Sequence, residues 1–278
     1  MRTKTKRIIQ FLILAVFVVG LMAGCGGNAN NAKDAADSDK AYILDKGAMK
    51  VGMTVYAPMN YFDDQGNLTG FDTEFTIAVC DKLGIEPDFI EINWDTKEVE
   101  LAAKNIDCIW NGLTVTEERK KNIQFSDSYI RNKQVVVIRL ADIDKFNSKE
   151  SLAGARLTAE IASAGESAIQ DDDILAGANY TAMAKQTDTL MEVKAGTADA
   201  AVLDYTAAKT LVGAGTSYND LMIIPGVDLA SEEYAIGFRI GSDIVPEINK
   251  IIQELIADGT LDKIAAKYDL SYLLLSNQ

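Results

Sequence analysis

The sequence contains no histidine, which removes the commonest general base and the commonest metal ligand of proteins. Nucleophile pairs of the Ser-His and Cys-His type are therefore excluded. Cysteines without a histidine are also a poor ligand set for zinc, since there are only three of them. We expect a protein that is not an enzyme and that carries no metal and no cofactor.

Cysteine is scarce in the body of the chain. After Cys25 only Cys80 and Cys108 remain, the first in a helical pattern and the second in a strand-like one. A disulfide between them is conceivable in an oxidising compartment. The simpler alternative is two buried free thiols that pack as small apolar groups.

Basic side chains are outnumbered, with 27 Lys and Arg against 41 Asp and Glu and a formal net charge of −14. The charge is nearer −18 once the four basic residues at the N-terminus are removed on export. No basic stripe is present to neutralise phosphates, so nucleic acid is not expected as a partner. An acidic surface favours solubility and says little about the fold.

The N-terminus has the layout of a secretory signal, with a basic start, an apolar run over residues 8–19 and small residues before Cys25. The apolar run is short for a membrane span, which needs about 20 apolar residues. Leu-x-Ala-Gly-Cys resembles the bacterial lipobox, whose cysteine is lipidated and becomes the mature N-terminus. This predicts a signal peptide over residues 1–24 and lipidation of Cys25, the alternative being a signal anchor with an incidental cysteine.

A polar linker is predicted next, over residues 25–40. Its side chains are small or polar, so they cannot bury enough surface to offset the entropy of the chain. We therefore expect the folded part to begin near Ala41.

Beyond the linker, strand-like and helical patterns alternate. Strands are expected at 48–53, 87–92 and 106–110, and helices at 72–83 and 97–104. The pattern then restarts, with strands at 134–138, 154–160, 200–204 and 234–239 and helices at 165–169, 187–195, 205–212, 245–257 and 261–268. This alternation predicts two α/β units, and the cleft between them would hold a ligand at the carboxyl ends of strands.

Two short segments carry candidate ligand contacts. In residues 111–119, a hydroxyl at Thr114 and a guanidinium at Arg119 beside free backbone N–H groups could bind a carboxylate. The alternative is a capping box formed by Thr114 and Glu117. Asp204 ends an apolar strand and could accept an ammonium group, or it could simply cap the following helix.

Several motifs in order resemble one known family, the extracellular solute-binding proteins that serve polar amino-acid ABC importers. The motifs are VGMTVYAPMNY (51–61), GNLTGFDTEF (66–75), NGLTVTEERKKNIQFSDSY (111–129), GTADAAVLD (196–204) and EEYAIGFRIGSD (232–243). The resemblance implies a two-lobed periplasmic-binding-protein fold of type II, with mainly parallel sheets flanked by helices. It places lobe 1 at 41–130 and 235–278, lobe 2 at 136–229, and the hinges at 131–135 and 230–234.

The same resemblance implies a binding site for an amino acid. Arg119 would pair with the α-carboxylate, with the Gly112 backbone and the Thr114 hydroxyl beside it, and Asp204 would hold the α-ammonium. Tyr56 and Trp94 would sandwich the side chain of the ligand, although core packing is an alternative for Trp94. The full expected set is Met53, Tyr56, Trp94, Asn111, Gly112, Thr114, Arg119, Glu160, Ser163, Ala164 and Asp204.

Two positions depart from the family pattern, and a third could affect which ligand is preferred. Ala162 stands where the second-lobe loop usually has glycine, and Met53 where members that take basic amino acids often have aspartate. Glu160 can face the side chain of the ligand and would then favour arginine or lysine. The alternative is a salt bridge between Glu160 and Arg156 or a hinge residue.

The expected function is therefore capture of an amino acid between two lobes by hinge closure and its delivery to the permease of an ABC importer. We expect a monomer outside the cytoplasm, held at the cell membrane by its lipid. A sensory lipoprotein would use the same capture chemistry. An enzyme resembling cyclohexadienyl dehydratase is a further alternative, which the absence of histidine disfavours.

Overall fold

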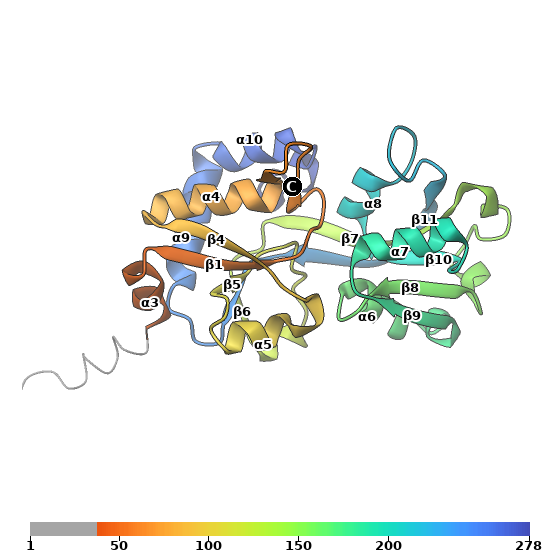
Figure 1. Ribbon diagram of the computed structural model, residues 1–278, viewed down its shortest axis with the longest axis horizontal. Coiled ribbons are helices and arrows are strands. Elements are labelled where there is room, and N and C mark those ends of the chain that lie inside the picture. The colour runs from red at the N-terminus through yellow and green to blue at the C-terminus, as the bar shows by residue number, and fades with distance from the viewer. Residues whose placement is uncertain (1–37) are drawn as a thin grey trace, which may run out of the picture.

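The computed structural model describes residues 38–278, and these form two α/β lobes joined by a pair of neighbouring strands (Figure 1). The predicted signal peptide and the lipidation site at Cys25 lie outside the described residues. Among the helices described, none is long and apolar enough to span a membrane.

The first lobe is built on a five-stranded sheet in the order β4-β1-β5-β12-β6. Strand β12 runs antiparallel to both of its neighbours, while β4, β1 and β5 pair in parallel. The strands are β1 (Ala48–Met53), β4 (Glu86–Glu91), β5 (Cys108–Ile109), β6 (Ile123–Phe125) and β12 (Gly237–Arg239). The helices are α3 (Asp39–Asp45), α4 (Phe71–Leu83), α5 (Lys97–Ala102), α9 (Val245–Ala257) and α10 (Thr260–Lys267), and a hairpin joins β2 (Tyr61–Phe62) to β3 (Leu68–Thr69).

The second lobe repeats this architecture with the strand order β11-β7-β10-β8-β9. Here β7 runs against β10 and β11, while β10, β8 and β9 pair in parallel. The strands are β7 (Ile130–Arg139), β8 (Arg156–Glu160), β9 (Asn179–Met183), β10 (Ala200–Asp204) and β11 (Leu221–Tyr234). The helices are α6 (Ala164–Gln170), α7 (Gln186–Ala195) and α8 (Tyr205–Leu211).

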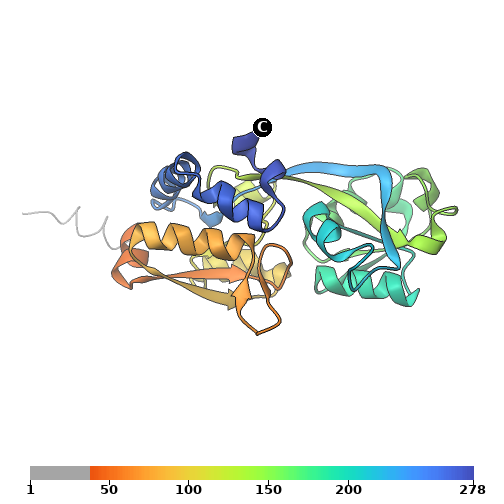
Figure 2. The ribbon, with the colours of Figure 1, turned by 90° about the horizontal axis from the view of Figure 1, so that it is seen from above.

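The two lobes are connected by β7 and β11, which run side by side between them (Figure 2). Their antiparallel register pairs Ile130 with Tyr234 and Gln134 with Ala230. The hinge segments predicted at 131–135 and 230–234 fall within this paired stretch. A two-stranded connection can bend without separating the lobes, which suits hinge closure.

Helices form where apolar residues recur at helical spacing. In α9 the residues Ile248, Ile251, Ile252 and Leu255 are all buried, and the predicted bounds 245–257 are confirmed. Helix α4 ends at Gly84, whose left-handed conformation (φ 70°) closes the last turn at low cost.

The N-terminal boundary differs from the prediction. Helix α3 begins at Asp39, so residues 38–40 belong to the folded domain and not to a linker. The Ser38 hydroxyl caps the helix by accepting from the Ala41 amide, and Asp39 pairs with the Arg239 guanidinium at 2.9 Å. Composition could not reveal this, because Arg239 lies 200 residues away in the chain.

Several strands also differ. The expected strand at 234–239 is divided between β11 and β12, β5 has only two residues, and β6, β9 and most of β11 were not predicted. Cys80 and Cys108 are free and buried, so the alternative of two packed thiols is confirmed.

Candidate functional site

A buried cavity lies between the lobes, at the carboxyl ends of strands from both sheets. Ten of the eleven predicted site residues line it, and Thr54 and Gln186 are additions that the sequence did not suggest. Met53, at the end of β1, is buried but is not part of the lining. The lining residues are Thr54, Tyr56, Trp94, Asn111, Gly112, Thr114, Arg119, Glu160, Ser163, Ala164, Gln186 and Asp204.

Arg119 brings a buried cation to this cavity from a 3-10 turn of the first lobe, Arg119–Lys121. Its Nη1 donates to the Thr114 carbonyl at 2.8 Å, and its Nη2 crosses to the second lobe and donates to the Ala162 carbonyl at 3.1 Å. Burial lowers the pKa of Arg119, but a guanidinium stays charged at neutral pH. The proposed capping box at Thr114 is wrong, because the turn starts later and Thr116 accepts from the Arg119 amide.

The turn before Arg119 depends on a glycine. Gly112 has φ +58°, and a Cβ at this position would lie 2.8 Å from the Tyr56 ring. Its N–H donates to the buried Asp72 carboxylate at 2.7 Å, so the expectation of a free amide is wrong here. The Thr114 hydroxyl donates to Glu232 at 3.0 Å.

Asn111 holds the neighbouring segment in place. Its Oδ1 accepts from the Thr54 amide and hydroxyl, and its Nδ2 donates to the Thr54 carbonyl and to Asn60. These bonds join the ends of β1 and β5. Asn111 therefore lines the cavity while its amide group is fully used within the first lobe.

Asp204 brings a buried anion from the second lobe, at the last residue of β10. It makes no side-chain cap to α8, so the capping alternative is not formed. Its carboxylate instead accepts from neutral side chains: Asn132 at 3.0 Å, Gln134 at 2.8 Å, Tyr234 at 2.7 Å and Gln186.

Glu232, a hinge residue that the sequence analysis did not single out, shares this network. It accepts from Asn132, from Gln134 at 2.9 Å and from Thr114. Burial, followed by the nearby charge of Asp204, raises the pKa of Glu232 well above its usual value. Both carboxylates accept from the same two amide side chains. The EEYAIGF string contains this residue, but nothing local to it indicates burial.

The two predicted aromatic residues border the cavity in different ways. The Tyr56 hydroxyl is bonded to Thr206 at 2.6 Å and to Tyr234 at 3.0 Å, which holds the ring edge toward the second lobe. Trp94 packs in an apolar cluster with Leu101 and Ile106 while also lining the cavity. The packing role is therefore observed, while the contact of Trp94 with a ligand stays a prediction.

Glu160, the last residue of β8, points a second carboxylate at the cavity and is 4% exposed. Arg156 pairs with Asp199 at 2.7 Å, so the expected alternative of a Glu160–Arg156 salt bridge is not formed. Burial, followed by the charge of Asp204, raises the pKa of Glu160 to about 8. A cation brought close to Glu160 would offset both effects.

The turn after β8 holds a residue in the left-handed conformation that favours glycine. Ala162 adopts φ +55°, which is strained for a residue with a side chain. Its amide donates to Glu166 at 2.6 Å, and Ser163 caps α6 by accepting from the Glu166 amide at 3.1 Å. The Ala162 amide is thus engaged within its own lobe.

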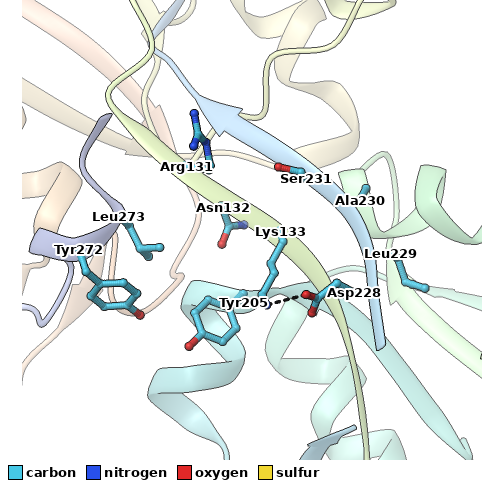
Figure 3. A pocket seen from close by; sticks show the side chains of 10 residues that line it. All are labelled: Arg131, Asn132, Lys133, Tyr205, Asp228, Leu229, Ala230, Ser231, Tyr272 and Leu273. Carbon is cyan, nitrogen blue, oxygen red and sulfur yellow. Dashed lines mark hydrogen bonds and ion pairs between the residues drawn. The ribbon is translucent and has the colours of Figure 1, made fainter. Parts of the chain in front are cut away.

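A second pocket lies on the hinge and is distinct from the interlobe cavity (Figure 3). Tyr205 and Tyr272 border it, and its lysine, Lys133, is paired with Asp228 at 2.8 Å. Neither Arg119 nor Asp204 reaches this pocket. Within residues 38–278, no group of three or more acidic or cysteine side chains could hold a metal ion.

The family profile described as "Bacterial extracellular solute-binding proteins, family 3" matches residues 49–271. The chain belongs to this family. Family 3 proteins similar to it are substrate-binding proteins of amino-acid ABC transporters, and membership implies a location outside the cytoplasm. The family and these relatives are binding proteins and not enzymes.

Individual proteins and structures that are similar to this chain cover most of its length. The L-cystine-binding protein TcyA of Bacillus subtilis is 31% identical over 95% of this chain and 97% of its own. The structure of holo ArgBP from T. maritima aligns with a TM-score of 0.72 at 33% identity, over 80% of this chain and 97% of that one. The ancestral amino acid-binding protein AncCDT-1, a precursor of cyclohexadienyl dehydratase, aligns with a TM-score of 0.76 at 27% identity, covering 83% and 99%.

Proposed function

We propose that this family 3 protein captures an amino acid in the interlobe cavity and delivers it to the permease of an ABC importer. One observation carries the proposal. Arg119 from the first lobe and Asp204 from the second are both buried at the cavity, and within the described residues neither makes an ion pair. Neutral groups hold both charges, so their natural counter-ions are the two ends of a zwitterion.

Burying a zwitterion is tolerable only when each charge gains a well-aligned partner. The Arg119 guanidinium suits a carboxylate because its planar fork can bind both oxygens. Asp204 suits an ammonium group, which can replace the weaker neutral donors around it. Because the partners lie on different lobes, the ligand would favour the closed arrangement over an open one.

For the side chain of the ligand we propose a basic amino acid, arginine or lysine. Glu160 supports this choice, since it is a buried carboxylate at the cavity without an ion pair in the described chain. ArgBP, one of the similar structures, is an arginine-binding protein by name, whereas TcyA binds cystine, so the relatives differ in ligand. We further propose a monomer anchored to the membrane through Cys25 after removal of residues 1–24.

Calorimetric titration with a panel of L-amino acids tests the proposal, after unfolding and refolding the protein to remove any co-purified ligand. We expect arginine or lysine to bind most tightly. Glu160→Gln should weaken them about tenfold while neutral amino acids change little, because a hydrogen bond to a charged group contributes about 1.5–3 kcal/mol.

The matched control is Glu117→Gln. The Glu117 side chain is 88% exposed, so this substitution should leave binding unchanged. Tight binding of a neutral amino acid, unaffected by Glu160→Gln, would keep the capture function and remove the basic preference. No binding across the panel would remove the function itself.

A further inference from the structure

Lys97 is a buried basic side chain at the cleft to which the capture chemistry above gives no role. Burial, followed by the charge of Arg119, lowers the pKa of Lys97 to about 7. Lys97 is the first residue of α5 and is 3% exposed. Its Nζ donates to the Trp94 carbonyl at 3.0 Å within its own lobe. It also donates to the Ala162 carbonyl of the second lobe at 3.0 Å.

Two basic side chains of the first lobe therefore donate to one carbonyl of the second. Arg119 Nη2 donates to the same Ala162 oxygen at 3.1 Å. That carbonyl belongs to the turn after β8, which is fixed by the bond between the Ala162 amide and Glu166. The Ala162 carbonyl is therefore a fixed acceptor on the second lobe for both Lys97 and Arg119.

The two donors are not equivalent toward a ligand. Arg119 keeps Nη1 on the Thr114 carbonyl of its own lobe, so Nη2 is the part of its fork shared between Ala162 and any incoming carboxylate. A carboxylate is the stronger acceptor, because a bond between two charged groups is shorter and stronger than one to a neutral carbonyl. Nη2 carries two N–H groups and can turn one of them to the ligand, but the pull of a carboxylate would lengthen and weaken its bond to the Ala162 carbonyl.

We propose that Lys97 is a positioning residue that keeps hold of the Ala162 carbonyl when Arg119 turns to the ligand, and so maintains the closed arrangement of the lobes. The inference rests on the proposed capture of a ligand by closure. Lys97 contacts backbone carbonyls of Trp94 and Ala162, which carry no information about the ligand. These two bonds should therefore contribute equally for every ligand, whereas the charge of Lys97 also acts on the pKa of Glu160 and so on the binding of a basic ligand.

The exposed interlobe ion pairs are poor substitutes for Lys97, whereas the buried hydroxyls of Tyr56 and Thr206 also join the lobes at 2.6 Å. Lys185 pairs with Glu91 across the cleft at 2.8 Å, but both side chains are nearly half exposed. Lys209 pairs with Asp269 at 2.7 Å, and Asp269 is largely exposed. Solvent screens such pairs, so they contribute little to closure.

The test uses Lys97→Met, which keeps an unbranched side chain without the donors, and Lys97→Arg, which restores them. Lys185→Met is the matched control. Titration gives the dissociation constants of the ligand panel, and stopped-flow mixing gives the dissociation rates. Spin labels on cysteines introduced at Val99 and Met191, exposed residues of the two lobes, report the interlobe distance with and without ligand.

We expect Lys97→Met to weaken neutral and acidic ligands by one common factor of about ten, through faster dissociation, because two hydrogen bonds at the cleft are lost. The order of preference among these ligands should stay unchanged, and in the saturated protein the interlobe distance should become longer or its distribution broader. Lys97→Arg should recover most of the loss, and Lys185→Met should stay within about twofold, since exposed pairs are weak.

Wild-type affinity and distances in Lys97→Met would overturn the inference. A loss of affinity confined to one of these classes of ligand would also overturn it, because Lys97 would then contact the ligand directly. A general loss of stability in Lys97→Met would appear as a lower melting temperature. In that case the interlobe distance in Lys97→Arg decides whether the donors at this position maintain closure. If the wild type binds no amino acid, the proposed function fails, while the distances in Lys97→Met still report on the contact with Ala162.

Discussion

The first lobe places basic side chains at the cleft, one on a short turn and one at the start of a helix, whereas the second lobe places carboxylates at the ends of strands. Arg119 lies in a 3-10 turn and Lys97 at the start of α5. Asp204 is the last residue of β10 and Glu160 the last residue of β8. These two strands pair in parallel, so their carboxyl ends meet at one edge of the sheet.

The two lobes also hold their charges by different means. The cations donate to backbone carbonyls, which cannot titrate. Asp204 accepts from amide and hydroxyl side chains contributed largely by the hinge strands. In neither lobe does a buried charge of the cavity form an ion pair within residues 38–278. Opposite charges thus face each other across the cleft without neutralising each other, which leaves that task to a ligand.

Removing the cation of the first lobe should have the largest effect. Arg119→Ala is expected to weaken amino-acid binding by about 3–5 kcal/mol, because a buried carboxylate of the ligand would lose its partner. Calorimetric titration measures the loss. Arg119→Lys should recover only part of it, since an ammonium lacks the planar fork.

The neighbouring Lys120→Ala serves as the control for Arg119, because its side chain is half exposed and paired only with Glu117. It should bind as the wild type does. An Arg119→Ala variant that binds within a few-fold of the wild type would show that the two lobes do not divide the charges of a ligand as proposed.

Neutralising the anion of the second lobe should have the next largest effect. Asp204→Asn keeps the size of the side chain but removes its charge, and a hydrogen bond to a charged group contributes about 1.5–3 kcal/mol. Affinity for all amino acids should fall accordingly in titration. The half-exposed Asp220→Asn, in the same lobe, should leave it unchanged. Equal affinities for Asp204→Asn and wild type would assign the α-ammonium to another group.

The smallest effect concerns stability and is confined to the first lobe. Burial raises the pKa of Asp72 to about 7, although the Gly112 amide and the Tyr129 hydroxyl donate to it. The folded state thus binds a proton that the unfolded chain, with a pKa near 3.8, releases. The stabilisation from Asp72 is therefore complete below about pH 4 and is lost as pH rises through about 7.

Asp72→Asn should remove this part of the pH dependence. The free energy of unfolding in urea, measured between pH 5 and pH 8, should fall less steeply in the variant than in the wild type. The exposed Asp64→Asn is the control and should keep the wild-type slope. Identical slopes for all three proteins would mean that Asp72 is ionised in the folded state throughout this range.

Local patterns predicted the elements whose determinants are local. The bounds of α9 and β10 were correct, since a helical stripe of isoleucines and a short apolar run define them. Strand β9 was missed because most of its side chains are exposed, as suits the edge of a sheet. Strand β11 was missed because Pro225 and Gly226 interrupt its pattern, while its pairing with β7 comes from a distant segment.

Site prediction followed the same division. Motif residues such as Arg119 and Asp204 were located because the family resemblance transfers position by position. Asn132, Gln134 and Glu232 were missed, since polar residues in a hinge strand carry no local sign of burial. Lys97 was placed correctly on a helix, yet its contact with Ala162, 65 residues away, depends on how the lobes meet.

The sequence by itself determined the absence of histidine chemistry, the excess of acidic charge, the alternation of strands and helices, and the order of motifs. Tertiary structure alone decided which polar side chains are desolvated and which share an acceptor. The physical reason is that burial and long-range hydrogen bonds are sums over residues far apart in the chain. The pKa values of Glu160 and Asp72, raised chiefly by burial, therefore belong to the folded protein and not to any local string.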